Sequence, residues 1–334
     1  MKKILLIATG GTIASKATES GLAPQISSAE LLTFVPEVAD ICEVHAIQVC
    51  NLDSTNLRYS EWLAIARAVE ENYHAYDGFV VTHGTDTMAY TAAALSYLIQ
   101  NSRKPVVLTG SQKSIYSRDT DARSNLISAF LYAADPRATG VHIVFDNKVI
   151  LGTRARKTRT KSYNAFSSID FPEVARIRDG RLYYYIEEKV EGDPVFYHKL
   201  NPRVFVLKLI PGMDPAIFDY LKHHYDGLII ESFGVGGLPY YDDADFSEAI
   251  RSFLDAGKTI VMTTRVPHEG SDMTVYEVGH LVKTRYDLIE AYDMTIEAVT
   301  TKLMWILSLT SNQERIKKLF YRPVQRDIIF SEGI

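Results

Sequence analysis

Two short turns hold the residues of this chain that are best suited to chemistry. Residues 9–12 read Thr-Gly-Gly-Thr, and residues 82–87 read Thr-His-Gly-Thr-Asp-Thr. Each turn directly follows a short apolar run, 4–8 in the first case and 78–81 in the second. Small residues combined with hydroxyl, carboxylate and imidazole groups at a strand end are typical of reaction sites in open α/β sheets. Two turns of the same build therefore predict chemistry carried by hydroxyl groups.

Further polar turns follow other apolar runs of the N-terminal half. They cover residues 51–56, residues 109–112, and residues 146–147 leading toward Lys157. The carboxyl ends of parallel strands meet at one edge of a sheet, so these segments can converge on one crevice. His83 is the one histidine placed among them. The residue types favour attack by a hydroxyl, with a lysine or a second hydroxyl handling protons.

Each of these residues also has a purely structural interpretation. Thr12 is equally suited to cap a helix or close a turn, and Thr85 and Asp86 could cap a helix over residues 88–98. Lys157 is one of five basic residues in the stretch 154–161. Such a run is ordinarily solvated, and the sequence does not single out which cation faces inward.

Composition excludes several classes of function. Charged residues make up 23% of the 334 residues and the net charge is −5, so nothing attracts the chain to nucleic acid or to anionic membranes. No apolar run approaches 18 residues, and the run after Met1 is too short for a signal peptide. Cys42 and Cys50 lie at opposite ends of one expected strand, too far apart to bridge, which favours reduced thiols and a cytoplasmic protein.

Neither a metal nor a cofactor is expected. The nine histidines are scattered, and neither residues 223–224 nor the acidic residues 242–245 have the spacing of metal ligands. The pattern Gly-x-Gly-x-x-Gly of dinucleotide sites is absent after the first strand, and Asp53 lies inside a hydroxyl-rich turn. A nucleotide-dependent oxidoreductase is therefore disfavoured.

Short apolar runs alternate with amphipathic stretches along the chain, which predicts a doubly wound α/β fold with mainly parallel strands. The polar, breaker-rich stretch 188–202 divides the chain. We expect an N-terminal α/β domain over 1–187 with the larger sheet, a linker over 188–202, and a C-terminal α/β domain over 203–334 with a smaller parallel sheet. The expected strands are 4–8, 44–50, 78–82, 105–109, 141–145, 204–210, 227–231 and 259–263. The expected helices are 60–69, 91–98, 245–254 (opened by a capping box at Asp245) and 297–307.

The two turns resemble the two signature motifs of bacterial-type L-asparaginases, in residues 9–15 and 83–88. The resemblance extends along the chain through residues 51–56, 109–112, 157–158, 207–212, 231–234 and 293–295. It is strongest to the cytoplasmic type I branch, because no secretory leader precedes the first strand. It implies hydrolysis of L-asparagine to L-aspartate and ammonia, without a metal or cofactor, by a homodimer or homotetramer.

The resemblance also implies roles for individual residues. Thr12 is the nucleophile that attacks the side-chain amide carbon, and Thr85, Lys157 and Asp86 form a second catalytic group. Lys157 handles the proton of Thr85, while Asp86 holds the lysine and the substrate ammonium. The residues expected to contact the substrate are Asp53, Ser54, Thr55, Gly84, Thr85, Asp86 and Ser111. Such a site suits a zwitterion, which needs acceptors and donors side by side.

One position departs from the family pattern. Many members carry a tyrosine in the loop after the first motif, where it helps to activate the nucleophile, and here Leu22 stands in its place. The stretch 15–28 is still expected to act as a lid, with Gly21 as a hinge. Burial of Lys157 and the charge of Asp86 act in opposite directions on the lysine, so its protonation state stays open.

Two alternatives to an asparaginase remain at this stage. An amidase subunit that releases ammonia for tRNA-dependent amidation would carry an extra N-terminal domain, which we do not expect here. A non-catalytic, two-lobed amino-acid-binding protein would need no paired threonines and would usually have a leader for export. Hydrolysis of glutamine and allosteric control cannot be read from the sequence, because a single methylene discriminates weakly.

Overall fold

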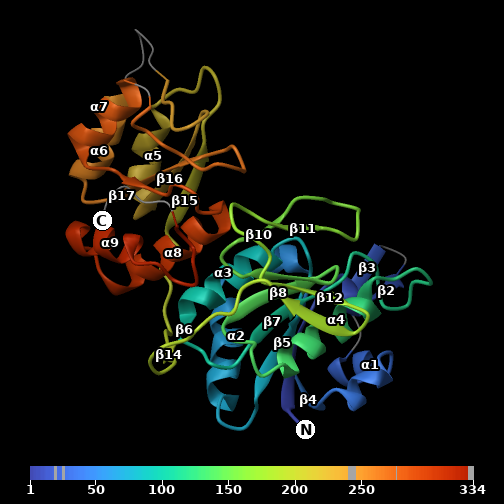
Figure 1. The fold of residues 1–334 in the computed structure, drawn as a ribbon. Coiled ribbons are helices and arrows are strands. Elements are labelled where there is room, and N and C mark those ends of the chain that lie inside the picture. The colour runs from blue at the N-terminus through green and yellow to red at the C-terminus, as the bar shows by residue number, and fades with distance from the viewer. Residues whose placement is uncertain (19–20, 25–26, 240–245, 276, 330–334) are drawn as a thin grey trace. The chain divides into compact units, whose positions relative to one another are not determined.

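The computed structural model describes residues 1–18, 21–24, 27–239, 246–275 and 277–329. The chain divides into two compact units, residues 1–198 and 199–334. Figure 1 shows the element order along the chain. None of the helices in the described residues is long and apolar enough to cross a membrane.

The N-terminal unit is built on an eight-stranded sheet with the order β13-β12-β9-β8-β7-β5-β1-β4. Strands β4, β1, β5, β7 and β8 run parallel, and β9, β12 and β13 extend the sheet by antiparallel pairing. The strands of this unit are β1 Lys3–Gly10, β2 Ser15–Thr18, β3 Gly21–Pro24, β4 Glu43–Leu52, β5 Gly78–Thr82, β6 Ile99–Gln100, β7 Val106–Thr109, β8 Val141–Phe145, β9 Lys148–Leu151, β10 Ala155–Lys157, β11 Phe166–Ser168, β12 Ala175–Arg178, β13 Arg181–Tyr184 and β14 Val195–Phe196. Its helices are α1 Ser28–Leu32, α2 Tyr59–Asn72, α3 Met88–Leu98 and α4 Ala122–Ala134.

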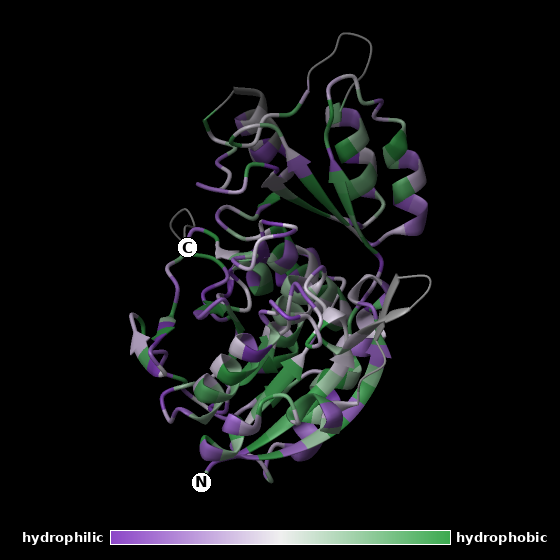
Figure 2. Cartoon of the chain, turned by 90° about the vertical axis from the view of Figure 1, so that its right-hand side faces the viewer, coloured by the Kyte–Doolittle hydropathy of each residue, from purple (hydrophilic) through white to green (hydrophobic). Residues whose placement is uncertain are grey.

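Both faces of this sheet are buried. Ile4 and Leu6 belong to the same core cluster as Leu126 and Phe130 of α4. Leu5 alternates with them along the strand and is equally buried, so the opposite face is covered as well. In Figure 2 the central strands are accordingly green, as expected for parallel strands between helical layers.

The C-terminal unit has a four-stranded parallel sheet with the order β15-β16-β17-β18. Its strands are β15 Val204–Lys208, β16 Gly227–Ser232, β17 Thr259–Thr264 and β18 Ile289–Glu290, and its helices are α5 Ile217–His224, α6 Phe246–Asp255, α7 Glu277–Tyr286, α8 Ile296–Leu309 and α9 Gln313–Tyr321. The predicted fold class, a larger mainly parallel sheet followed by a smaller parallel one, is confirmed. Asp245, the expected capping residue, lies outside the described residues.

Most of the short antiparallel strands are not predicted by the sequence pattern. Strands β9, β12 and β13 lengthen the main sheet, and β10 pairs with β11 in a separate two-stranded sheet. These segments have two to four residues each in contact, too few to produce a clear hydrophobic period. Within the expected linker, β14 pairs with β6 of the first unit.

Candidate active site

Three turns meet at the carboxyl edge of the main sheet, and glycines allow the contact. Gly11 has a φ of 81°, and a Cβ added there would lie 2.4 Å from the Gly84 nitrogen. A Cβ on Gly84 would lie 2.6 Å from Ser54 Oγ. The turns after β1 and β5 therefore touch through their backbones, and the Ser54 side chain of the turn after β4 packs against Gly84, with no room for a side chain at either glycine.

Thr12 opens a short 3₁₀ turn, Thr12–Ala14, directly after β1. The preceding residue, Gly11, is the cap of this turn, and no side chain caps it. The turn is held instead by Ser15, whose hydroxyl donates to the Gly11 carbonyl at 2.9 Å. Thr12 itself is half-buried, and within the described part of the chain its hydroxyl has no hydrogen-bond partner. The position of Thr12 is thus set by the backbone of this turn.

Thr85, Lys157 and Asp86 form a directly hydrogen-bonded group. The Lys157 Nζ donates to Thr85 Oγ1 at 2.8 Å and to Asp86 Oδ1 at 2.6 Å. Thr85 is 5% exposed, and the side chain of Lys157 is 16% exposed against 59% for Asp86. The ion pair therefore reaches from the protein interior toward solvent, with the threonine hydroxyl at its inner end.

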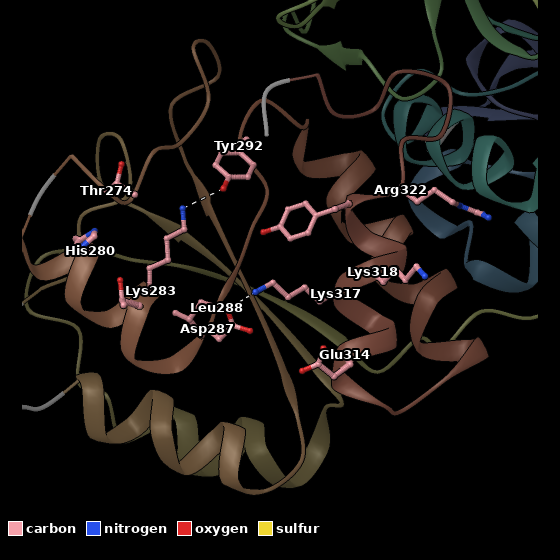
Figure 3. Close-up of a pocket in the computed structure, with 12 residues that line it drawn as sticks. Thr274, His280, Lys283, Asp287, Leu288, Tyr292, Glu314, Lys317, Lys318 and Arg322 are labelled. Carbon is pink, nitrogen blue, oxygen red and sulfur yellow. Dashed lines mark hydrogen bonds and ion pairs between the residues drawn. The ribbon is translucent and has the colours of Figure 1, made fainter. Parts of the chain in front are cut away.

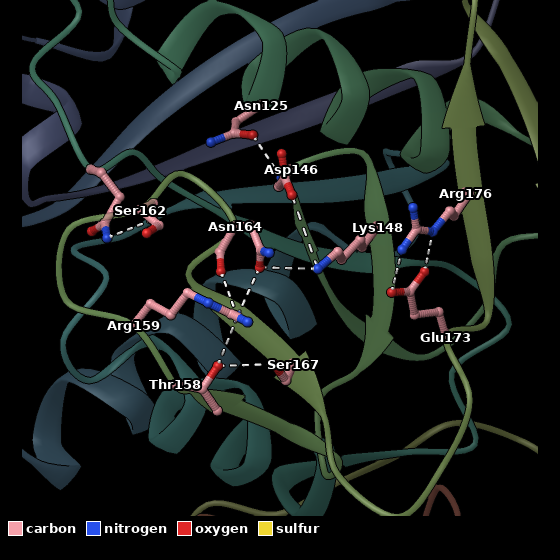
Figure 4. Close-up of polar contacts among 11 residues, drawn as sticks. Asn125, Asp146, Lys148, Thr158, Arg159, Ser162, Asn164, Ser167, Glu173 and Arg176 are labelled. Atoms are coloured by element: carbon pink, nitrogen blue, oxygen red, sulfur yellow. Dashed lines mark hydrogen bonds and ion pairs between the residues drawn. The ribbon is translucent and has the colours of Figure 1, made fainter.

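The structure shows which cation of the basic run 154–161 faces this group. Lys157 ends β10 and turns to Thr85, whereas Arg154 is fully buried. Arg159 stays within the loop between β10 and β11, where its Nη1 donates to the Asn164 carbonyl at 3.1 Å and to Asn164 Oδ1 at 3.0 Å (Figure 4). Asn164 Oδ1 also accepts from Lys148 Nζ at 3.2 Å. These hydrogen bonds brace the loop between β10 and β11.

His83 fastens the second turn to the helix that follows it. Its Nδ1 lies 2.7 Å from the Gly84 carbonyl oxygen and its Nε2 lies 2.8 Å from Thr91 Oγ1 of α3. Because a carbonyl oxygen only accepts, Nδ1 carries the proton and Nε2 accepts from the threonine. Complete burial lowers the pKa of His83 to about 4, so the ring is neutral near pH 7. His83 is therefore a structural neighbour of the site and no base.

The remaining predicted binding residues lie around the same edge. Ser54 is 2% exposed, and its carbonyl accepts from Thr87 Oγ1 at 2.7 Å. Asp53 is exposed, and its Oδ1 accepts from the backbone N–H of Thr55 at 2.8 Å and from the Thr55 hydroxyl at 2.7 Å. Ser111 is fully buried, and its hydroxyl donates to the Lys113 carbonyl within its own turn. Ser111 thus shapes the turn after β7.

Sequence reasoning assigned no role to Gln112, which contacts the Thr85 hydroxyl. Thr85 Oγ1 donates to Gln112 Oε1 at 3.2 Å. The turn that carries Gln112 is clamped by the buried Asp121, which accepts from the Gln112 backbone N–H at 2.9 Å and from Asn125 Nδ2 at 3.2 Å. A buried aspartate at the start of a helix is the signal that could have indicated a built turn here.

The segment after Thr12 forms a hairpin, in which β2 pairs with β3 and Leu22 is opposite Ala17. The Leu22 side chain and residues 19–20 lie outside the described residues, so the lid expected over 15–28 and the replacement of the tyrosine stay predictions. Among the described residues, the turn after β7 approaches the base of this hairpin. Ser114 Oγ donates to the Ser15 carbonyl, and the Ile115 N–H donates to the Ile13 carbonyl at 3.3 Å.

Charged residues also line a cavity of about 760 Å³ in the C-terminal unit (Figure 3). Two of its lysines, Lys283 and Lys317, have acidic partners. Lys283 Nζ lies 2.7 Å from the buried Glu290 carboxylate and 3.2 Å from the Tyr292 hydroxyl, and Lys317 pairs with Asp287. Glu290 and Tyr292 raise the pKa of Lys283 against the effect of burial, so it stays charged. The hydroxyl that contacts a lysine here is the phenol of Tyr292, and no lysine of the cavity bonds a threonine hydroxyl among the described residues.

Comparisons with known proteins show the family of the chain. Residues 3–190 match the family description "Asparaginase, N-terminal", and residues 203–320 match "Glutaminase/Asparaginase C-terminal domain". The chain is 38% identical to L-asparaginase of Thermococcus kodakarensis, covering 98% of this chain and 99% of that protein. It is 32% identical to L-asparaginase 1 of Escherichia coli K12, with 98% of each covered.

Solved structures give the same result. The thermostable L-asparaginase from Thermococcus kodakarensis superposes with a TM-score of 0.91, covering 98% of this chain and 100% of that one. L-asparaginase I from Vibrio cholerae is 26% identical and superposes with a TM-score of 0.85, covering 98% and 99%. The comparisons give no support to a non-catalytic amino-acid-binding protein. By its two domains and by the turns that meet at its sheet edge, the chain belongs to the asparaginase/glutaminase family.

Proposed function

We propose that this protein hydrolyses the side-chain amide of L-asparagine, giving L-aspartate and ammonia. The observation that carries the proposal is the Thr85–Lys157–Asp86 group, with a turn that bears Thr12 packed against it through Gly11 and Gly84. Membership of the family and full-length similarity to L-asparaginases support the same reaction.

In this proposal Thr12 is the nucleophile. Its oxygen attacks the amide carbon, and collapse of the tetrahedral intermediate breaks the C–N bond. The threonine proton passes to the departing nitrogen, so that ammonia leaves and an ester of Thr12 remains. Water then attacks the ester carbonyl, the bond to Thr12 breaks, and the hydroxyl regains a proton while aspartate is released. The oxyanion of both steps needs donors, and the backbone N–H groups of Thr12 and Thr85 are our candidates.

Lys157 is proposed to handle protons through Thr85. It is the one cation of the basic run that bonds the Thr85 hydroxyl among the described residues, and Asp86 fixes its Nζ from the other side. Asp86 is largely exposed, so it also has an oxygen to offer the substrate ammonium. Holding the reacting groups in one geometry before the substrate arrives is what makes such a group effective.

Substrate binding is assigned to the same edge. Asp53, Ser54 and Thr55 form one turn that offers a carboxylate, two hydroxyls and backbone N–H groups to the zwitterionic end of asparagine. We keep Gly84 among the substrate contacts, and its lack of a side chain lets Ser54 pack directly against the second turn. Ser111 supports the site from the next turn, where its hydrogen bond to Lys113 leaves only its lone pairs for a ligand.

Ammonia release from L-asparagine by the purified wild-type protein tests the proposal. Turnover is expected for the wild type and for Thr12→Ser at a reduced rate, whereas Thr12→Ala should lose about 10³-fold or more in kcat with its fold intact. Tight binding of asparagine without ammonia release would show a binding protein instead. Near-normal turnover by Thr12→Ala would remove Thr12 from the mechanism.

Three finer points belong to the same proposal. We place the protein in the cytoplasm, in line with a probable cytoplasmic L-asparaginase from Campylobacter jejuni that superposes with a TM-score of 0.82. We also propose that it assembles as a homodimer or homotetramer. We keep the domain limits 1–187 and 203–334, with the linker 188–202. Sedimentation of the purified protein measures the assembly, and limited proteolysis maps the linker.

A further inference from the structure

Hydrogen bonds to Asp121 hold the backbone of Gln112 in place. Its N–H donates to both oxygens of Asp121, at 3.1 and 2.9 Å, and the neighbouring Lys113 N–H donates to Asp121 Oδ1 at 3.1 Å. Asp121 is 6% exposed and is held in turn by Asn125. A carboxylate that accepts several N–H groups fixes a turn rigidly. The Gln112 side chain therefore projects from a defined point.

The side-chain amide of Gln112 bridges two segments of the site. Its Nε2 donates to the Ser162 carbonyl at 3.1 Å, in the loop between β10 and β11, and its Oε1 lies 3.2 Å from Thr85 Oγ1. Figure 4 shows Ser162 at this end of the loop. A carbonyl oxygen can only accept, so the nitrogen of the amide must face Ser162 and its oxygen must face Thr85. The two partners thus settle the orientation of the amide.

This orientation fixes the direction of the Thr85 proton. The Thr85 hydroxyl has one proton, and Gln112 Oε1 can only accept it. The lone pairs of Thr85 Oγ1 then face Lys157 Nζ, which donates to this oxygen at 2.8 Å. Thr85 is buried, so without Gln112 this proton would be left with no acceptor in the described residues or would rotate toward the lysine.

We propose that Gln112 is a positioning residue for the Thr85–Lys157 group: it holds the Thr85 hydroxyl as an acceptor toward the lysine and ties it to the hairpin that carries the lysine. The inference rests on the proposed function. It adds to that function a residue that touches neither the proposed nucleophile nor the ion pair, and that acts through the hydroxyl of Thr85.

Gln112 both orients the Thr85 hydroxyl and connects two loops. Nearby contacts provide a control that separates these two effects. Lys113 pairs with Asp119 and lies over the Tyr163 ring, 5.6 Å from its centre, and the Tyr163 hydroxyl donates to the Asp119 carbonyl. These contacts join the same two loops without touching Thr85. Lys113→Met therefore weakens the connection between the loops and leaves the Thr85 hydroxyl as it is.

The test compares the kinetics of ammonia release from L-asparagine by full-length variants. Gln112→Met keeps the length of the side chain and removes both hydrogen bonds, so kcat should fall about 10- to 30-fold while KM stays within about threefold. Gln112→Glu keeps an acceptor for Thr85 and loses the donor to Ser162, so it should recover kcat to within about threefold of the wild type. Lys113→Met should keep wild-type kcat.

The outcomes separate cleanly. An unchanged kcat in Gln112→Met overturns the inference, and so does an equal loss in Gln112→Met, Gln112→Glu and Lys113→Met, which would show a loop contact only. If Gln112→Met does not fold, Gln112→Asn serves in its place, because its shorter amide cannot reach both partners. A wild type that releases no ammonia would reject the proposed function itself, independently of Gln112.

Discussion

Two lysine–aspartate pairs of the molecule have the same length and opposite surroundings. Lys157 and Asp86 in the N-terminal unit are 2.6 Å apart, and so are Lys302 and Asp327 in the C-terminal unit. The second pair is fully buried, and Lys302 Nζ also donates to the Arg322 carbonyl at 3.0 Å. The first pair is partly exposed to solvent, and its lysine also donates to the Thr85 hydroxyl. The pair that we propose to serve chemistry keeps one side open to solvent, whereas the pair in the C-terminal unit is enclosed.

The largest expected effect comes from breaking the enclosed pair. Lys302→Met removes the cation that lies 2.6 Å from the buried Asp327 carboxylate, which should lower the free energy of unfolding by about 3–5 kcal/mol. Chemical denaturation followed by fluorescence measures the loss. A loss below about 1 kcal/mol would mean that this pair is as weakly coupled to the fold as a surface pair.

Breaking the open pair should act on the rate instead. Lys157→Met should lower kcat about 10³-fold, equivalent to about 4 kcal/mol of transition-state free energy, because the Thr85 hydroxyl loses its proton partner. Thermal unfolding should stay within a few degrees of the wild type, since the lysine makes its bonds at the sheet edge. Combining Lys157→Met with Thr85→Val should cost little more than either change alone if the two residues act as a unit.

The contrast between these pairs also marks what sequence can predict. The strands that end at Gly10, Thr82 and Thr109 follow from apolar runs, because buried parallel strands are continuously hydrophobic. The edge strand that ends at Leu52 is half-exposed and follows from its alternating pattern. Lys157 can be named by family resemblance only. It lies on a three-residue strand, where its pairing partner Phe166 is nine residues further along the chain. Which of the five cations faces the site depends on contacts with Asp86 and Thr85, which are 71 and 72 residues away in the sequence.

The lowered pKa of His83 predicts that the stability of the protein depends on pH. Its pKa is lowered to about 4 in the folded protein and is about 6.5 when unfolded, so between these values only the unfolded state binds the proton. Stability should therefore fall by about 3 kcal/mol as the pH is lowered from 6.5 to 4. His142, buried in β8, has a similarly lowered pKa and should add to the slope.

Denaturation curves at several pH values measure this slope. His83→Gln should flatten part of it and leave the contribution of His142 in place. If the slope in the variant equals that of the wild type, His83 is not neutral and buried in solution.

The smallest expected effect is that of changing the aspartate of the open pair. Asp86→Asn removes the charge of a side chain that is 59% exposed, so the free energy of unfolding should change by less than about 1 kcal/mol. Asp327→Asn, the matched change in the enclosed pair, should be several times more destabilising. Parallel denaturant titrations of the two variants make the comparison, and equal losses would contradict it.

Lys157 lies on a small sheet of its own, β10 and β11, outside the ladder of the main sheet. Three residue pairs hold these strands together, with Phe166 packed edge-on against Phe145. Local opening of such an element requires far less free energy than global unfolding. We therefore expect two separate transitions on heating. Catalysis would disappear reversibly at a temperature where the amide protons of β1 and β5 are still protected from exchange.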